Sequence, residues 1–307
     1  MMEDETRPLF LVEKESPAAT WTRRLSSPNS TQSHPQTIAH RGAKAHAKEN
    51  TLAAFRLAAS SGAHAIETDA RLSRDGVAVL AHDLGLERCF GRSGVVGDLE
   101  AARLRALGVV LLSELLEWLV EGEEEDSWKA GMWVLLDIKM DDDAALLLAA
   151  IKRAVDEVPS GKTPWEKRIA STLLAARRLL PSHATAHIGT SHRYAQTFTA
   201  RMPTLALNLA YTAVPRKTSQ PLYAWTVNDE ATMRWALGHA CIDAVVTDDP
   251  ARFRALCEEE LAGRVVARRM GVWAGLCWRW DWACVRVWHR LVFWYRRFWI
   301  RKLDLLR

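Results

Sequence analysis

The sequence predicts an α/β fold built on a parallel sheet, and two observations support this class. Short β-type runs alternate with helical patterns between residues 36 and 260, which is the rhythm of strand–helix–strand units. Hydrophobic residues make up 49% of the chain and charged residues 25%, a composition that excludes a disordered or collagen-like protein. A single α/β barrel of about 250 residues would account for most of the 307 residues.

The individual elements follow from local patterns along the chain. Apolar β-type runs predict strands, and the longer periodic stretches between them predict helices. The predicted strands are Thr37–His40, Ala65–Asp69, Val77–Ala81, Trp133–Ile138, Ala184–Ile188, Thr204–Asn208, Leu222–Thr226 and Ala244–Thr247. The predicted helices are Thr51–Ser60, Leu112–Glu121, Asp142–Val158, Asp229–Leu237 and Ala251–Leu261.

Polar residues gather where the early strands end, which is the active face of a parallel barrel. Glu67 and Asp69 are two residues apart on one strand, so both carboxylates project from the same side. Carboxylates held this close repel, and a bound proton or cation relieves the repulsion. Oxygen ligands of this kind suit Mg²⁺ or Ca²⁺. Asp137 and Lys139 repeat the spacing and offer a third carboxylate and a cation for an anionic substrate.

Two histidines, His40 and His82, also end strand-like runs. A histidine pair can hold one proton between them and move it during displacement at phosphorus, and the neighbouring Arg41 can bind phosphate oxygens. Taken alone, a Glu-x-Asp pair is usually a solvated face and a lone His is usually structural. The Asp75-Gly76 pair predicts a hairpin turn. The combination of all these groups at strand ends favours chemistry.

These residues together resemble the glycerophosphodiester phosphodiesterase family. The resemblance is carried by His40-Arg41-Gly42, Glu49-Asn50-Thr51 with Phe55, Glu67-x-Asp69, Asp75-Gly76, His82-Asp83, Arg88, Ala224–Asn228 and Asp243–Pro250. It spans about residues 37–255. The segments Trp133–Lys139, His187–Ser191 with Tyr194-Ala195, and Trp225–Asn228 with Met233 look most similar to the fungal phosphatidylglycerol phospholipase C branch.

The resemblance implies a TIM (β/α)8 barrel over residues 36–262 and a phosphoric diester hydrolase. It implies one divalent cation, Mg²⁺ or Ca²⁺, on Glu67, Asp69 and Asp137, and His40 and His82 as the acid/base pair. Arg41 and Lys139 are expected to contact the phosphate, and Trp225 to line the pocket near the organic part of the substrate. The expected substrates are glycerophosphodiesters and glycerophospholipids, with phosphatidylglycerol preferred.

The middle of the predicted barrel is short. Arg168–Ser171 runs directly into a Leu/Ala/Arg stretch, and only 16 residues separate Asn208 from Trp225, where a crossover would need a helix. The chain is therefore either a compact variant or a barrel incomplete around strand 4 and helix 6. The second case would give a catalytically impaired lipid-binding protein. A phospholipase D-like enzyme on a similar barrel is another alternative.

The net charge of +4 conceals a strong asymmetry. Residues 264–307 contain 11 Lys and Arg against two Asp and Glu, together with seven of the 14 Trp. On a helical wheel, six arginines fall on one stripe opposite aromatic and apolar residues (Arg268, Arg279, Arg286, Arg290, Arg297, Arg301). This pattern predicts an amphipathic C-terminal helix, over residues 263–307, in the plane of an anionic membrane surface. The alternatives are packing on the barrel and a nucleic-acid arm, which the acidic body would oppose, so nucleic acid is not an expected partner.

The remaining signals concern the compartment. Five cysteines are spread without a C-x-x-C pair, which favours a reducing compartment. The first 35 residues mix acids, Ser, Thr and Pro, which predicts a disordered leader. Their only apolar run, Pro8–Val12, is too short for a signal peptide. We therefore expect an intracellular, peripheral membrane protein on the cytoplasmic face of an organelle or lipid droplet, and not a secreted one.

Overall fold

The computed structural model describes residues 16–262 apart from residues 27–32, 122, 124, 125, 127 and 173–175. The predicted interfacial helix at residues 264–307 and the first 15 residues of the predicted leader lie outside the described residues. Within the described part of the chain, no helix is both long enough and apolar enough to cross a membrane.

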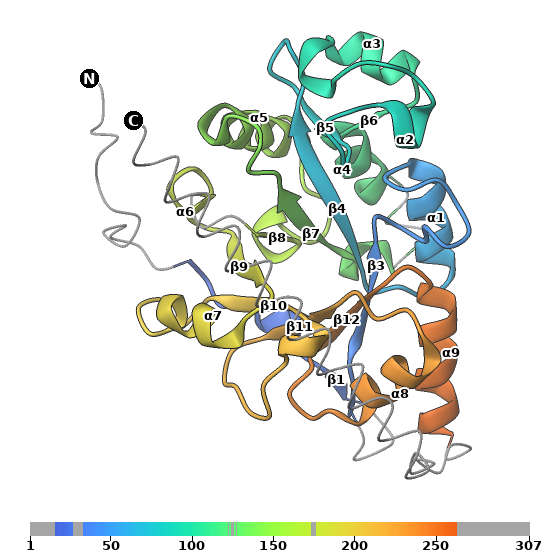
Figure 1. Ribbon diagram of the computed structural model, residues 1–307, viewed down its shortest axis with the longest axis vertical. Helices are drawn as coiled ribbons and strands as arrows, with labels where there is room; N and C mark the ends of the chain where they lie inside the picture. The colour runs from blue at the N-terminus through green and yellow to red at the C-terminus, as the bar shows by residue number, and fades with distance from the viewer. Residues whose placement is uncertain are drawn as a thin grey trace.

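Eight parallel strands of this described region close into a barrel (Figure 1). The closing pair is the first and last strand, with Ile38 beside Val246. The predicted α/β barrel is therefore confirmed. Its strands, in order around the barrel, are β3 (Gln36–His40), β4 (Ala65–Leu72), β7 (Trp133–Ile138), β8 (Ile169–Ser171), β9 (Ala184–Gly189), β10 (Ala206–Ala210), β11 (Leu222–Trp225) and β12 (Ala244–Thr247).

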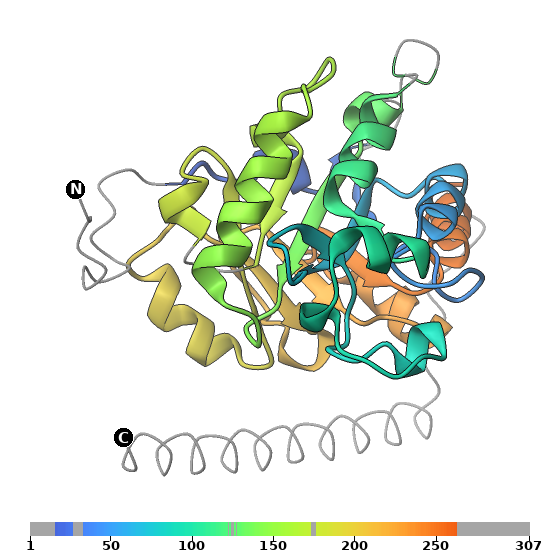
Figure 2. The ribbon, with the colours of Figure 1, turned by 90° about the horizontal axis from the view of Figure 1, so that it is seen from above.

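Helices surround this barrel, and their starts are set by capping side chains. Thr51, Asp143, Ser191, Asp229 and Asp249 each accept a hydrogen bond from a backbone N–H of the first helical turn, which satisfies donors that the helix cannot. Figure 2 shows the first and last of the outer helices side by side, as closure of the barrel requires. The helices are α1 (Leu52–Ser60), α5 (Ala144–Glu157), α6 (Ala176–Leu179), α7 (His192–Thr199), α8 (Glu230–Gly238) and α9 (Pro250–Leu261).

An insertion follows β4, which continues beyond the barrel and turns back as a hairpin (Figure 1). Gly76 sits in the turn with φ +78°, and the Asp75 carboxylate accepts a hydrogen bond from Ser73, so the predicted hairpin turn is confirmed. The predicted strand Val77–Ala81 is thus an antiparallel return strand outside the barrel. The insertion comprises β5 (Ala78–Leu80), α2 (Glu87–Phe90), α3 (Ala101–Ala106) and β6 (Val110–Leu111). The chain then returns to the barrel through α4 (Leu112–Val120), which packs with α5 and the outer face of β7 in one hydrophobic cluster.

The short middle of the chain does not prevent closure. The three-residue strand β8 pairs with β7 on one side and β9 on the other. Between β10 and β11 the crossover contains a 3-10 helix, Tyr211–Ala213, in place of an α-helix. The expectation that a crossover here needs a helix of about ten residues was wrong, because this short segment is sufficient to reach the next strand. The chain is a compact barrel, and not an open one.

The barrel interior is organised in layers. With the stagger of about one residue per strand that eight strands require, the strand register places Ala65, Ala170, Ala206 and Ala244 in one layer. The next layer holds Ile38, Leu135, Ala186 and Tyr223, all buried. Above it lie Glu67, Thr172, Asn208 and Val246, and then His40, Asp137, Ile188 and Trp225. The interior is therefore mainly apolar in the two layers below Glu67 and polar at the carboxyl ends of the strands.

The amino end of the barrel is closed by part of the segment that was predicted to be a disordered leader. Ala19 and Thr22 are 0% exposed, and the Thr22 hydroxyl accepts a hydrogen bond from Tyr223 at 2.7 Å. The chain then forms a two-stranded antiparallel pair, β1 (Leu25–Ser26) with β2 (Ser33–His34). The prediction of disorder was wrong for these residues, because the small side chains of the lower layers leave the barrel floor to be filled by another segment.

Candidate active site

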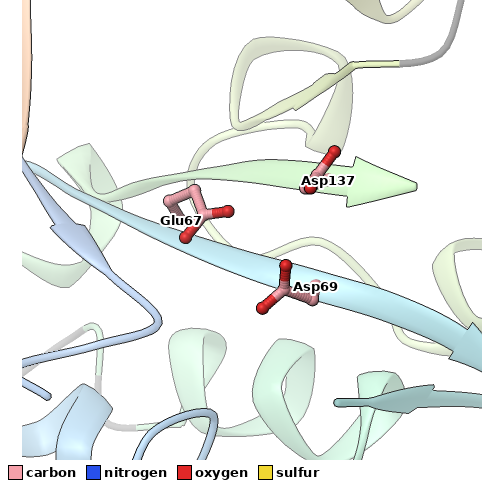
Figure 3. Close-up of side chains that lie close together, drawn as sticks. All are labelled: Glu67, Asp69 and Asp137. Atoms are coloured by element: carbon pink, nitrogen blue, oxygen red, sulfur yellow. The ribbon is translucent and has the colours of Figure 1, made fainter. Parts of the chain in front are cut away.

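Three carboxylates meet at the carboxyl end of two neighbouring strands. Glu67 and Asp69 project from β4 and Asp137 from β7 (Figure 3). One oxygen of each lies within 4.8 Å of the others, and both β4 acids are almost completely buried. The register pairs Asp69 directly with Asp137. The structure therefore brings together all three residues that the sequence suggested as metal ligands.

Two cations partly balance these acids. The Lys139 ammonium lies 2.6 Å from Asp69 and 2.7 Å from Asp137, and the Arg41 Nε lies 3.2 Å from Asp69. Burial would raise the pKa of Asp69, but Lys139 and Arg41 outweigh it and lower the pKa below its usual value. Lys139 is raised in pKa because these carboxylates outweigh its own burial. Asp69 is thus ionised.

Glu67 is the carboxyl group of the cluster that these two cations balance least. Burial raises the pKa of Glu67 well above its usual value, and the adjacent Asp69 and Asp137 raise it further. A buried carboxyl group in this situation binds either a proton or a cation. The donor set is three carboxylates, which suits the hard divalent cations Mg²⁺ and Ca²⁺. Glu67, Asp69 and Asp137 therefore fit a divalent cation by their chemistry and by their charge.

A strained loop holds the acids in place. Asn50 adopts φ +55°, donates from its amide to Asp69 at 2.9 Å and accepts from Thr68 at 2.8 Å. Gly42 has φ +82°, and a Cβ there would lie 2.7 Å from the Cβ of Ala54, so only glycine allows this approach. The Arg41 backbone N–H donates to Glu67 at 3.0 Å. The His-Arg-Gly and Glu-Asn-Thr segments thus hold the two acids of β4 in place by hydrogen bonds.

His40 is oriented by an acid that directly follows the last barrel strand. Its Nδ1 lies 2.6 Å from Asp248, and its Nε2 lies 3.9 Å from Glu67. Burial lowers the pKa of His40, and the Asp248 carboxylate opposes this effect without cancelling it. The Asp248 carboxylate is itself ionised, because His40 and Lys44 lower its pKa despite its burial. Nδ1 therefore donates to Asp248, and Nε2 faces the acids as a proton acceptor.

His82 is held in the same manner by a different element. It follows the antiparallel strand β5, and its Nδ1 lies 2.6 Å from Asp83. Arg88 joins Asp83 to Glu49, with Nη2 2.6 Å from the Glu49 carboxylate. Although burial would raise it, the pKa of Glu49 falls to about 2 because of Arg88 and Arg41. His82 thus reaches the mouth of the barrel through the insertion, and a chain of ion pairs connects it to Arg41.

Sequence reasoning gave no role to the residues that orient these groups. Asp248 and Asp83 were recognised only as parts of motifs, and Thr172, which donates to Asp137 at 2.7 Å, was not recognised at all. The adjacency of His82 and Asp83 was the one local signal. Trp225 lies in the same layer as His40, and its indole donates to the Asn208 carbonyl at 3.0 Å. Lys139, expected at the phosphate, is paired with two of the acids.

Residues 40–252 match the model of the glycerophosphoryl diester phosphodiesterase family. The chain belongs to this family. A relative from Mycobacterium tuberculosis, named probable glycerophosphodiester phosphodiesterase 1, is 37% identical over 108 residues, which are 35% of this chain and 39% of the relative. The chain thus matches well under half the length of that protein. Glycerophosphodiester phosphodiesterase GDPD4 of Arabidopsis thaliana is 24% identical over 74% of each chain.

Solved structures agree with the barrel. An Oleispira antarctica phosphodiesterase, in complex with the product sn-glycerol-3-phosphate, superposes with a TM-score of 0.60 at 23% identity over 73% of this chain and 97% of its own. A glycerophosphodiester phosphodiesterase from Thermotoga maritima gives a TM-score of 0.58 at 23% identity over 73% and 98% of the two chains. At these identities the likeness concerns the fold, and family membership follows from the family model.

Proposed function

We propose that the protein is a divalent-metal-dependent hydrolase of glycerophosphodiesters. The observation that carries the proposal is the acid cluster of Glu67, Asp69 and Asp137, placed beside His40 at the barrel mouth in a chain of this family. The cation would be held by these three carboxylates, and when bound it would polarise a phosphoryl oxygen and offset the developing negative charge. Arg41 and Lys139 would bind the remaining phosphate oxygens.

His40 and His82 would share the proton transfers. Each has its Nδ1 paired with a carboxylate at 2.6 Å, so each presents Nε2 for chemistry with a fixed ring orientation. The pKa of His40 is lowered by burial, which keeps the ring neutral and suits a general base that accepts the proton of the attacking hydroxyl. His82, on the more exposed insertion, would protonate the leaving alcohol. The nucleophile is water or a hydroxyl group of the substrate.

We further propose glycerophospholipids as substrates, with phosphatidylglycerol preferred, as in the fungal phosphatidylglycerol phospholipase C branch. An exposed apolar rim at the mouth supports this. Met140, 71% exposed, follows Lys139 directly, and Leu84 follows His82-Asp83. Exposed apolar groups gathered around a site mark a surface that meets an apolar partner. The rim comprises Leu84, Met140, Leu146, Ile188 and Tyr194.

The basic, Trp-rich residues 264–307 would add a second contact with an anionic membrane surface, with residues 36–262 as the catalytic barrel. In this proposal the protein is peripheral and intracellular. Removal of the tail should weaken binding to anionic vesicles. Equal vesicle binding by residues 1–263 and by the full chain would contradict the proposed role of the tail.

The decisive experiment compares two substrates with and without metal. Purified protein is incubated with phosphatidylglycerol vesicles or glycerophosphoglycerol in Mg²⁺, Ca²⁺ or excess EDTA, and the phosphorus products are identified. We expect release of glycerol phosphate that stops in EDTA. Full activity in EDTA would reject the metal, and vesicle binding without turnover in any metal would favour a lipid-binding protein. Choline or a cyclic phosphate among the products of a choline lipid would indicate the phospholipase D-like reaction.

The apolar rim has its own control. Met140→Gln with Leu146→Gln should lower turnover of vesicle lipid about 10²-fold, because each buried apolar side chain contributes about 1.5–3 kcal/mol and about 1.4 kcal/mol is tenfold, while turnover of glycerophosphoglycerol should not change. Leu57→Gln removes a less exposed leucine from α1, outside the rim, and should change neither activity. Equal losses on the soluble diester and on vesicles would contradict the proposed lipid contact.

A further inference from the structure

One buried polar group at the mouth has no partner in the described part of the chain. The Asn208 side chain on β10 is 3% exposed, and its Oδ1 has no hydrogen-bond partner there. A buried acceptor without a hydrogen bond lowers the stability of the folded protein by about 1–3 kcal/mol. Nearly all buried polar groups in native proteins therefore have a hydrogen-bond partner. Leu207 and Leu209 on either side face the outer helices, which directs Asn208 into the barrel.

The register places this amide opposite the acid cluster. Asn208 pairs with Ile188 on β9 and with Tyr223 on β11, and the stagger of the strands puts it in the same layer as Glu67. Strand β10 is four strands from β4 in either direction around the barrel, so the two side chains project toward each other across the interior. Asn208 thus lies at the base of the mouth, at the carboxyl end of the barrel, one layer below His40 and Trp225.

Among the described residues, those next to Asn208 on β9, β10 and β11 are uncharged. Its inward-facing neighbours on β10 are Ala206 and Ala210, both buried, and Val246 shares its layer. The adjacent Trp225 is held by a hydrogen bond to the Asn208 backbone carbonyl. The side-chain oxygen of Asn208 is a neutral acceptor, and in these uncharged surroundings a neutral donor is its most suitable partner. A glycerol phosphate offers such a donor, because it carries hydroxyl groups next to its phosphate.

We propose that Asn208 is a specificity-determining residue that accepts a hydrogen bond from a glycerol hydroxyl of the substrate. The phosphate of that glycerol phosphate group would lie at Glu67, Asp69 and Asp137, and the hydroxyl would reach across to Asn208. This assignment rests on the proposed function and extends it from the phosphodiester to the alcohol. It makes the glycerol phosphate part the group that the site selects.

The test separates recognition of glycerol from recognition of phosphate. In Asn208→Leu, a change of similar volume, the metal-loaded protein is titrated with sn-glycerol 3-phosphate and with inorganic phosphate by calorimetry. We expect the Kd for glycerol phosphate to rise about 10- to 100-fold and the Kd for inorganic phosphate to change less than twofold. In turnover, KM should rise for glycerophosphoglycerol and stay constant for bis(p-nitrophenyl) phosphate, which has no alcohol hydroxyl.

Two controls identify a purely structural effect. Ser171, on β8, is also buried, and its hydroxyl has no partner among the described residues. It faces the helices, so Ser171→Ala should leave both dissociation constants unchanged. The thermal midpoint of Asn208→Leu should be unchanged or higher, because an unpaired acceptor has been removed.

The assignment would be overturned if Asn208→Leu raised the Kd of both ligands equally or changed neither Kd. It would also be overturned if the unaltered protein did not bind glycerol phosphate. The binding measurement does not require turnover. A protein that binds glycerol phosphate through Asn208 but hydrolyses no diester would refute the proposed hydrolysis and leave the role of Asn208 standing.

Discussion

At the carboxyl ends of the strands, the inward-facing positions hold His40, Glu67 and Asp137, whereas at the amino ends the same alternation places Gln36 and Trp133 inside the barrel. The mouth gathers like charges and an acid with a raised pKa. At the floor, the Trp133 indole donates to Gln36 at 2.8 Å, and the Gln36 amide donates to the backbone carbonyls of Trp21 and Arg23. One backbone pattern therefore supports two environments, and the side chains alone decide which end is reactive and which is stable.

Changes at the mouth should affect turnover far more than folding. Replacement of His40 by Gln should lower kcat about 10²- to 10⁴-fold, because it removes a proton-transfer group, with little change in the thermal midpoint. Steady-state hydrolysis of glycerophosphoglycerol measures the effect. His183→Gln, which alters a buried histidine before β9, is the control, and an equal loss of kcat there would remove the distinction between the two ends.

Changes at the floor should instead affect the stability of the fold far more than turnover. Trp133 is 1% exposed and packs 5.7 Å from the Tyr223 ring, so Trp133→Ala should lower the free energy of unfolding by about 3–5 kcal/mol. Denaturant titration measures this loss, and active-site titration gives kcat per folded molecule, which should stay close to the unaltered value. A large loss of kcat in the folded fraction would show that the floor also shapes the mouth.

The pair of Asp248 and His40 provides a finer test through pH. Burial lowers the pKa of His40 and Asp248 opposes this, so Asp248→Asn should lower that pKa further. If neutral His40 is the base, activity falls as the pH drops through its pKa, and the acidic limb of kcat should move to lower pH. The loss of ring orientation should also reduce kcat about tenfold or more. An acidic limb that moves to higher pH would contradict the role of His40 as base.

The smallest effect is expected from a histidine near the floor. Burial, with Arg254 and His34, lowers the pKa of His64 to about 3, and its Nδ1 accepts from the Thr37 backbone N–H at 2.9 Å. Between about pH 6.5, where an unfolded histidine titrates, and pH 3, the unfolded chain binds more protons, so stability decreases as the pH falls.

His64→Asn keeps an acceptor and removes this titration. The variant should lose less stability than the unaltered protein between pH 6.5 and 5, by up to about 1.4 kcal/mol per pH unit, as measured by urea titration at each pH. Parallel pH dependence in the two proteins would show that His64 is not titrating on unfolding.

The acids on β4 and β7 could be predicted from sequence, because two-residue spacing on a strand fixes a common face without knowledge of the neighbours. Asp137 followed from the same local rule, and His40 from its position at the end of a strand-like run. The roles of Asp248 and Thr172 could not be predicted, since each acts on a residue far away in the chain. His82 was assigned to the mouth for the wrong local reason, because its strand is an antiparallel return and not a barrel strand.

What the sequence determined by itself is therefore the alternation of strands and helices and the pairs of residues that share a strand face. Tertiary structure decided the rest, because closure depends on register around the whole barrel. The three-residue strand β8 is sufficient only because both neighbours pair with it. Residues 16–26 are ordered because the alanine-rich lower layers leave a floor for Ala19 and Thr22 to fill, and no local pattern in a polar leader could reveal that requirement.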